Sequence, residues 1–445
     1  MTKKPLSKYF SIYRILGIFV IFLGVFLPMV IKFVFDLNQI SSSTNRVILL
    51  IFQLILILLG ILLLFIRDPK KSIKKLIFRT ILGILLLLFL ESGLQVANLI
   101  FNFRISESER YLKHPAFDGH EWAESLFKEF DSLKIVFSPY TIWRRSEFTG
   151  EHINIDNLGI RKTWNPSNRD KEEVKKIYIF GGSALWGTGA RDDFTIPSFL
   201  SKRLNNQGIP CDITNYGESG YIFTQEIVKL VLLLNEGYRP DVVLFYDGFN
   251  DVYSAYSYGK PDTIHDLEDI TRRFSGRKLK LNINKMITKA KEGSFLYDAI
   301  DKIVYAISKE KQFKERGARY SDERLSELAE DIVQNYLQTM MTLEKLSETY
   351  GFTYLCFWQP VLYLEEKVFE AEKQADPRIQ DTAFSKLYKE VDRIITREAN
   401  TNLIQLKTAL SERTFPCYLD LCHLCEAGND LIVQMISLSV STMME

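Results

Sequence analysis

The chain has 445 residues, a formal net charge of +1 and 47% hydrophobic residues. Its charge is unevenly distributed, because residues 1–105 hold 13 Lys and Arg against 3 acidic residues and leave the rest of the chain near −9. A body of that sign lacks the basic face that a phosphate backbone needs, which excludes nucleic acid as the expected partner.

Three apolar stretches occupy most of the N-terminal hundred residues, at about 15–35, 47–66 and 80–101. Each is close to the ~20 residues that cross a bilayer, so they predict a three-helix membrane domain over residues 1–105. A signal peptide is the alternative for the first stretch, but no small-residue cleavage site follows it. Basic residues precede the first stretch and separate the second from the third, which predicts a cytoplasmic membrane protein whose C-terminal body is extracytoplasmic.

The third stretch is the weakest, because Glu91 interrupts it. A carboxylate inside a membrane is a functional candidate. The alternative is that Glu91 packs against the other helices or lies near the outer headgroups. If this stretch only lay on the membrane surface, the large C-terminal body would be cytoplasmic instead.

Residues 106–172 are polar, contain three prolines and show no long periodic run, which predicts a connecting region with a few short strands. From residue 173 to residue 445, short β-rich segments alternate with helical ones, a pattern typical of a parallel sheet with crossover helices. We expect strands over 177–180, 212–215, 242–246 and 353–357, and helices over 196–206, 224–235, 325–350 and 428–443.

A basic insertion interrupts this alternation at about 262–325. Residues 271–320 hold 14 basic and 5 acidic residues, and apolar residues between 295 and 307 recur at helical spacing. The insertion is either a solvated helical cap whose apolar stripe joins the core, or a surface for anionic headgroups or an anionic polymer. Since it leaves from the carboxyl end of a strand, we expect it near the functional site in both cases.

The five cysteines are an odd number, so no complete disulfide framework is implied and their pairing stays open. Cys422-His423-Leu424-Cys425 superficially resembles metal-ligand spacing, but no second ligand pair of the usual kind accompanies it. We therefore predict neither a metal nor a cofactor. The cysteines are Cys211, Cys356, Cys417, Cys422 and Cys425.

Candidate catalytic residues lie in two distant segments. Ser183 follows a buried strand in the run Gly181-Gly182-Ser183, where glycines allow a tight exit from the sheet. A serine hydroxyl needs a base within hydrogen-bond reach and a third group that orients that base. Asp420 and His423 are three residues apart, so one loop could supply both. Each signal alone is weak, since many strand-to-helix turns contain Gly-Gly-Ser and an isolated Asp-x-x-His is commonly a surface loop.

Three hydrogen-bond donors could stabilise the oxyanion of a tetrahedral intermediate. They are the backbone N–H of Ser183, the backbone N–H of Gly217 and the side-chain amide of Asn250, which follows the strand 242–246. Asp251 is expected to brace its loop. Trp186, Tyr221 and Trp358 could stack on sugar rings, although core packing is the alternative for them.

The ordered motifs GGSALWG, NYGESG, GFND and DLCH resemble the SGNH hydrolase superfamily, also called GDSL-like esterases, over about residues 175–440. The resemblance implies a flavodoxin-like α/β/α sandwich with a mainly parallel five-stranded sheet. It also implies Ser183 as nucleophile, His423 as base and then acid, Asp420 as orienter, and Gly217 with Asn250 in the oxyanion hole. Gly182 stands where the family usually has aspartate, which is similar to membrane-anchored bacterial members that act on surface polysaccharides.

Three functions are then expected to compete. The first is an esterase that removes acyl groups, above all acetyl, from an extracytoplasmic glycan. The second is an O-acyltransferase that passes the acyl group through the same serine to a cell-surface polysaccharide, which requires a separate membrane acyl-donor protein. The third is a non-catalytic envelope assembly protein. The expected partners are thus the lipid bilayer and an acylated glycan.

Overall fold

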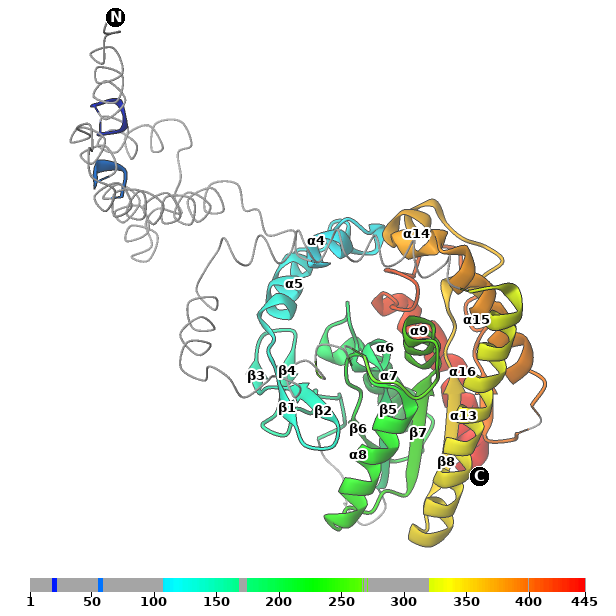
Figure 1. The fold of residues 1–445 in the computed structure, drawn as a ribbon. Coiled ribbons are helices and arrows are strands. Elements are labelled where there is room, and N and C mark those ends of the chain that lie inside the picture. The colour runs from blue at the N-terminus through cyan, green and yellow to red at the C-terminus, as the bar shows by residue number, and fades with distance from the viewer. Residues whose placement is uncertain are drawn as a thin grey trace, which may run out of the picture. The chain divides into compact units, whose positions relative to one another are not determined.

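The computed structural model describes residues 18–21, 55–58, 107–167, 174–265, 267, 270, 320–398 and 400–444. The chain divides into two units, residues 1–105 with 277–311, and residues 106–276 with 312–445. The elements below belong to the second unit (Figure 1). Among the described residues, no helix combines the length and apolar character that a membrane crossing requires. Only residues 18–21 and 55–58 of the predicted membrane stretches are described. Outside the described residues lie Glu91 and residues 271–319 of the basic insertion.

A parallel five-stranded sheet organises the second unit. Its strands are β5 (Lys175–Gly181), β6 (Cys211–Asn215), β7 (Val242–Asp247), β8 (Thr353–Trp358) and β9 (Leu403–Gln405), and their spatial order is β6-β5-β7-β8-β9. In chain order this is 2-1-3-4-5, the flavodoxin-like arrangement of the doubly wound α/β fold. The strand register pairs Ile179 with Leu244 and Leu244 with Leu355 across the three central strands.

The central strands are buried on both faces, which their apolar sequences require. Every residue of β7 is buried, and five of the seven residues of β5 are buried. A parallel strand with helices over both faces has no solvent side, so its sequence is a continuous apolar run. The predicted strand positions are therefore right, with boundaries that differ by one or two residues.

Helices cover the two faces of the sheet. The chain reverses direction along the sheet after β6, so right-handed crossovers place α7 (Ile196–Asn206) and α8 (Phe223–Asn235) on opposite faces. α7 packs against α16 (Glu426–Met444), whereas α8 packs against α13 (Asp322–Tyr350). α9 (Phe249–Tyr258) and α15 (Thr382–Ile395) also contact α13. Short elements complete this part, namely α6 (Ser183–Trp186), η3 (Asp192–Phe194), η4 (Leu362–Leu364), α14 (Glu370–Ala375) and η5 (Pro377–Gln380).

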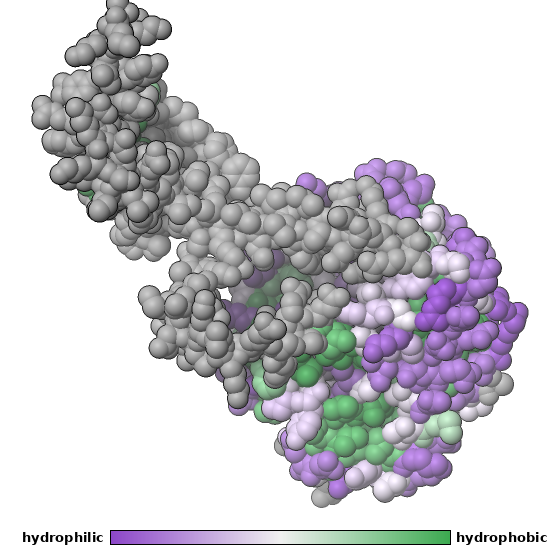
Figure 2. Space-filling view, in the orientation of Figure 1, coloured by the Kyte–Doolittle hydropathy of each residue, from purple (hydrophilic) through white to green (hydrophobic). Residues whose placement is uncertain are grey.

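α15 shows how patterning places a helix. Asp381 caps its N-terminus, accepting a hydrogen bond from the backbone N–H of Phe384, and its apolar side chains from Phe384 to Ile395 lie on one buried face. Hydrophilic residues face outward on the side of the domain where α13 and α15 lie (Figures 1 and 2). α15 and β9 were both missing from the predicted elements, although the five-stranded count was right.

The segment 106–172 is more than a connection. It forms α4 (Glu107–Leu112), η2 (Pro115–Phe117), α5 (Trp122–Ser132) and two small antiparallel pairs, β1 (Ile135–Ser138) with β2 (Ile142–Arg145) and β3 (Phe148–Thr149) with β4 (Asn154–Ile155). The predicted short strands are present. No long periodic run was predicted here from the sequence, but α5 is an 11-residue amphipathic helix, and its periodic pattern was overlooked. Tyr111, Phe117 and Phe127 join the main core, so the segment belongs to the same unit as the sheet.

Candidate active site

The fold puts Ser183 at the carboxyl edge of the sheet. β5 ends at Gly181, Gly182 has an extended backbone, and α6 begins at Ser183. Asn250 follows β7, the strand beside β5, at the same edge. Because the chain runs from β5 to one side and from β7 to the other, this edge is the topological switch point where such folds place their sites.

Ser183, His423 and Asp420 form one hydrogen-bonded chain. Ser183 Oγ lies 2.7 Å from His423 Nε2, and His423 Nδ1 lies 2.6 Å from Asp420 Oδ2. The second carboxylate oxygen of Asp420 accepts hydrogen bonds from the backbone N–H groups of Cys422 and His423, both at 2.9 Å. The turn 420–423 therefore fixes the carboxylate and the imidazole relative to each other, as the three-residue spacing predicts.

The ionisation of the pair sets the histidine tautomer. Burial opposes charge on Asp420, but the neighbouring His423, the hydrogen bond between them and the Arg378 guanidinium hold the Asp420 pKa well below its usual range. An ionised carboxylate can only accept, so His423 Nδ1 must donate to it. His423 Nε2 is then left to accept the Ser183 hydroxyl proton, which is the arrangement a general base requires.

His423 has the opposite pKa shift. Burial lowers its pKa, but the Asp420 carboxylate outweighs that effect and raises the pKa of the imidazole. His423 Nε2 can therefore accept the Ser183 proton only at a pH above that raised pKa. Asp420 is 1% exposed, whereas Ser183 and His423 are half-buried. Ser183 and His423 thus keep some exposure, whereas Asp420 keeps almost none.

The predicted oxyanion donors lie beside α6. A Cβ atom on Gly182 would lie against the Asn250 amide nitrogen, and one on Gly217 would lie 3.1 Å from Trp186 Cα. In this structure the Asn250 amide donates to the carbonyl of Tyr221 at 2.7 Å, and the Gly217 N–H donates to Asn215 Oδ1 at 3.0 Å. The amide of Asn250 has a second N–H, and Gly217 would have to share its proton with an oxyanion.

A close contact accounts for the glycine at position 182. Any side chain at position 182 would displace the Asn250 amide from where it lies. Glycine at position 182 and asparagine at position 250 are therefore matched to each other.

Two polar side chains hold the C-terminal end of α6. The Arg161 guanidinium donates to the carbonyls of Trp186 at 3.1 Å, Gly187 at 2.7 Å and Ala190 at 2.6 Å, and pairs with Asp192 at 3.0 Å. The Asn215 amide also donates to the Trp186 carbonyl, at 3.3 Å. Asn215 thus joins α6 to the Gly217 N–H: its amide nitrogen donates to the Trp186 carbonyl, and its amide oxygen accepts from Gly217. Neither residue was assigned a role from the sequence. Asn215 begins the motif NYGESG, in which only Gly217 was given a role, and nothing local marks Arg161.

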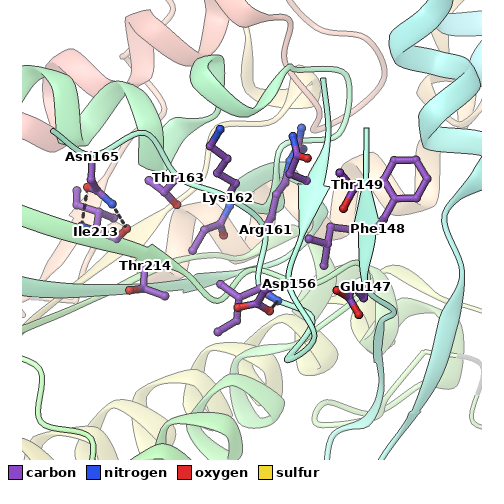
Figure 3. A pocket seen from close by; sticks show the side chains of 14 residues that line it. Glu147, Phe148, Thr149, Asp156, Arg161, Lys162, Thr163, Asn165, Ile213 and Thr214 are labelled. Atoms are coloured by element: carbon purple, nitrogen blue, oxygen red, sulfur yellow. Dashed lines mark hydrogen bonds between the residues drawn. The ribbon is translucent and has the colours of Figure 1, made fainter. Parts of the chain in front are cut away.

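A cavity of about 450 Å³ opens along edge strand β6 (Figure 3). Arg161 and Asn215 lie in its wall, whereas Ser183, Asp420 and His423 do not line it. Asn165 also lines it, and its side chain pairs with both backbone groups of Ile213 at 3.0 Å. The cavity is therefore separate from the Ser183 hydroxyl.

Three buried carboxyl groups lie behind Asn250. Burial raises the pKa of Asp251 to about 7, although backbone hydrogen bonds oppose this shift. Burial also raises the pKa values of Glu226 and Asp247 well above their usual range. Asp247 and Asp251 add to the shift of Glu226, and Asp251 adds to that of Asp247, whereas the hydrogen bond with Glu226 opposes the shift of Asp247. Asp251 accepts a hydrogen bond from the backbone N–H of Phe223 at 3.1 Å, which agrees with its expected bracing role.

The aromatic candidates for sugar stacking are part of the core. Trp186 and Trp358 are fully buried and Tyr221 is 3% exposed. Arg161 covers the Trp186 ring with its guanidinium carbon 4.3 Å from the ring centroid. The packing alternative is therefore right for all three residues.

The cysteine-rich turn contains a possible donor set for a metal. One ligand atom each of Asp420, Cys422 and His423 lies within 4.8 Å of the others. His423 Nδ1 and the Asp420 carboxylate already bond to each other, and burial raises the pKa of Cys422, which keeps it a thiol. These residues fit the Ser-His-Asp arrangement better than a zinc site, which needs thiolates and free imidazoles. Cys425, the second cysteine of the run Cys422-His423-Leu424-Cys425, is not among these three residues.

A second serine and histidine pair lies in the N-terminal segment. Ser125 Oγ is 2.7 Å from His152 Nε2, a contact that sequence patterns did not predict. The Ser125 hydroxyl also donates to the Trp122 carbonyl at 2.9 Å. The Glu151 carboxylate is 3.9 Å from the same Nε2 atom, and the Glu129 carboxylate accepts from the His152 backbone N–H at 3.0 Å and not from the ring. This pair lacks the orienting group that Asp420 supplies to His423.

No protein-family profile and no curated protein matches the sequence. Solved structures do show likeness over about 60% of the chain. They include an acetyl xylan esterase (14% identity, 99% of that chain, TM-score 0.30), a lipolytic G-D-S-L family protein from Veillonella parvula (13%, 99%, 0.33) and an acetylxylan esterase from Geobacillus stearothermophilus (14%, 94%, 0.30). The fold assignment itself rests on the strand order, and the chemistry rests on the side chains described above.

Proposed function

We propose that this chain is a serine esterase of the SGNH type that removes O-acyl groups from a glycan. The observation that carries the proposal is the continuous chain from Ser183 Oγ through the His423 ring to the buried Asp420 carboxylate, at the switch point of a flavodoxin-like sheet. The distances of 2.7 and 2.6 Å are those of a nucleophile, base and orienter ready for proton transfer.

The first half of the proposed reaction forms an acyl-enzyme. Ser183 Oγ attacks the ester carbonyl carbon while its proton moves to His423 Nε2. The carbonyl oxygen becomes an oxyanion that the Ser183 N–H, the Gly217 N–H and the Asn250 amide stabilise. The ester bond then breaks, His423 returns the proton to the departing sugar oxygen, and the acyl group stays on Ser183.

The second half releases the acid. A water molecule gives a proton to His423 Nε2 and attacks the acyl carbon. As the resulting intermediate collapses to free carboxylic acid, His423 returns that proton to Ser183 Oγ and restores the hydroxyl. Asp420 remains ionised throughout and stabilises the imidazolium that forms twice in the cycle. No further reactant is needed to balance the reaction.

The proposed setting is the outer side of a cytoplasmic membrane. Its support is the three apolar stretches within residues 1–105 and the basic residues around them. A small acyl group such as acetyl on an envelope glycan is the substrate class consistent with that location. An O-acyltransferase would use the same acyl-enzyme with a sugar hydroxyl in place of water, and would need a membrane protein to supply the acyl group.

The test compares the O-acetyl content of surface polysaccharide in cells with the wild-type chain, without it, and with Ser183→Ala. A rise in O-acetyl content in both altered strains supports removal by the esterase. A fall in both would replace the esterase proposal with the transferase. Equal content in wild-type and Ser183→Ala cells, with a change only on deletion, would support a non-catalytic assembly protein instead.

A further inference from the structure

A tyrosine from the N-terminal segment contacts the buried end of the catalytic chain. The hydroxyl of Tyr111, on α4, donates to Asp420 Oδ2 at 2.8 Å. The same oxygen accepts the His423 Nδ1 proton at 2.6 Å. Tyr111 and Asp420 are 309 residues apart in the chain and are 4% and 1% exposed.

Packing holds the Tyr111 hydroxyl in this place. Its ring stacks on Phe127 of α5 with centroids 5.8 Å apart, and its edge meets the His423 ring at 6.5 Å. The Arg110 guanidinium carbon lies 5.2 Å from the Tyr111 ring centroid on another side. Neighbours on several sides therefore limit the rotamers that the phenol can adopt.

We propose that Tyr111 is a positioning residue of the active site, whose hydroxyl holds the Asp420 carboxylate and limits how strongly that carboxylate attracts the His423 proton. The inference rests on the proposed function for its catalytic consequence. It does not rest on that function for the hydrogen bond or for the titration of His423, which can be measured in an inactive protein.

Tyr111 and His423 share one oxygen of the Asp420 carboxylate, Oδ2. Asp420 accepts four hydrogen bonds, two on Oδ1 from backbone N–H groups and two on Oδ2 from Tyr111 and His423. A hydrogen bond to the ionised form stabilises that form, and a charge-assisted bond is stronger than a neutral one. Without the Tyr111 hydroxyl, Oδ2 keeps more negative charge for His423 and stabilises the imidazolium more.

Loss of the Tyr111 hydroxyl should shift the acid limb of the pH profile to higher pH. His423 Nε2 must be unprotonated to accept the Ser183 proton. A more stable imidazolium loses its proton only at a higher pH, so activity appears at a higher pH than in the wild type. The Asp420 carboxylate also gains freedom to rotate, which misaligns the imidazole.

The other charged and titratable groups around Asp420 and His423 are the same in the wild type and in a Tyr111→Phe variant. Arg378, of η5, lies between the carboxylates of Asp376 and Asp420 and acts on both. The remaining groups facing the pair are Arg110 on α4, Cys422 within the turn and Ser183 on α6.

The experiment uses Tyr111→Phe in the full chain, with Tyr256→Phe as the matched control. The Tyr256 hydroxyl is also buried and also bonds to a carboxylate, that of Asp381 at 3.1 Å, but it lies outside the catalytic chain. Two readouts are followed against pH: kcat/KM on an activated acetyl ester, and the imidazole Cε1–H signal of ¹³C-histidine protein, assigned to His423 with His423→Gln.

For Tyr111→Phe we expect the acid limb of kcat/KM and the His423 titration to move together to higher pH, by about 0.5 to 1 unit. We also expect kcat to fall about 3- to 10-fold with KM unchanged. Tyr256→Phe should lower the melting temperature without moving either titration. A Tyr111→Phe protein whose His423 titration coincides with the wild type, or moves to lower pH, would overturn the proposal.

A second variant covers the case in which Tyr111→Phe does not fold. Fluorotyrosine at position 111 keeps the ring and the hydroxyl, and its more acidic hydroxyl is a stronger donor to Asp420. The His423 titration should then move to lower pH, opposite to Tyr111→Phe, and no movement would contradict the proposal. If the wild-type chain cleaves no ester, the proposed function fails while the His423 titration still decides the role of Tyr111.

Discussion

The described part of the chain contains two serine and histidine pairs with the same separation and different surroundings. Ser183 and His423 are 2.7 Å apart, and so are Ser125 and His152. Only the first histidine has an ionised carboxylate on its other ring nitrogen, and only the first serine lies at the carboxyl edge of the parallel sheet. A short Ser-His distance is therefore not enough for an active site. The histidine also needs a fixed tautomer, and the serine needs an accessible place at the sheet edge with oxyanion donors beside it.

The largest expected difference is between the two serines. Ser183→Ala should lower kcat on an acetyl ester by about 10⁴-fold or more, because it removes the nucleophile. Ser125→Ala should leave kcat within about two-fold, since the Ser125 pair has no orienting carboxylate. A steady-state assay of both full-length variants measures this, and equal activities would remove the basis for distinguishing the pairs.

The next effect comes from the orienting carboxylate. Asp420→Asn should lower kcat by about 10⁴-fold, because the neutral amide can donate to Nδ1 and stabilise the wrong tautomer of His423. The matched change is Glu151→Gln, beside His152, which should leave the rate unchanged. Circular dichroism checks that both variants are folded, and an Asp420→Asn rate near that of the wild type would contradict the assigned role of Asp420.

A third prediction tests the support of the nucleophile helix through stability. Arg161→Ala should lower the free energy of unfolding by about 3–5 kcal/mol, because the buried Asp192 carboxylate loses the charge that compensates it and three carbonyls each lose a donor. The control is Arg203→Ala, since the Arg203 pair with Asp430 is about one-third to one-half exposed and should contribute at most ~1 kcal/mol. Urea unfolding of the two variants decides between a buried network and an ordinary surface pair.

The smallest of these effects concerns the oxyanion donors. Asn250→Ala should lower kcat by about 10²-fold to 10³-fold with little change in KM, because the amide acts on charge that develops in the transition state. Gly182→Ala should reproduce part of that loss, since its methyl group would displace the Asn250 amide. If Gly182→Ala kept the full rate, Asn250 would have to act from a different position.

The sequence was sufficient for the parts of the site that lie next to strand ends. Ser183 and Asn250 follow apolar strands, and Asp420 and His423 are near neighbours in the chain, so short motifs locate them. Buried parallel strands are also easy to find, because both faces demand apolar residues. The three-residue strand β9 is too short for such a pattern.

The supporting residues could not be predicted in the same way. Tyr111 and Arg161 come from a segment that looks like a connection, and their partners lie 309 and 25 to 31 residues away. A long-range polar contact leaves no periodic trace, because it depends on where two elements meet in space. The amphipathic helices α5 and α15 did leave a periodic trace, so their omission was a misreading and not a limit of the sequence.

The most direct test of the central claim is to locate a covalent adduct. The full-length protein is treated with a fluorophosphonate, digested and mapped by mass spectrometry. We predict one adduct, on the peptide that contains Ser183, with Ser125 unmodified and with labelling abolished by Ser183→Ala and strongly slowed by Asp420→Asn. Labelling on another serine, or labelling that persists in Ser183→Ala, would contradict the assignment of Ser183 as the nucleophile.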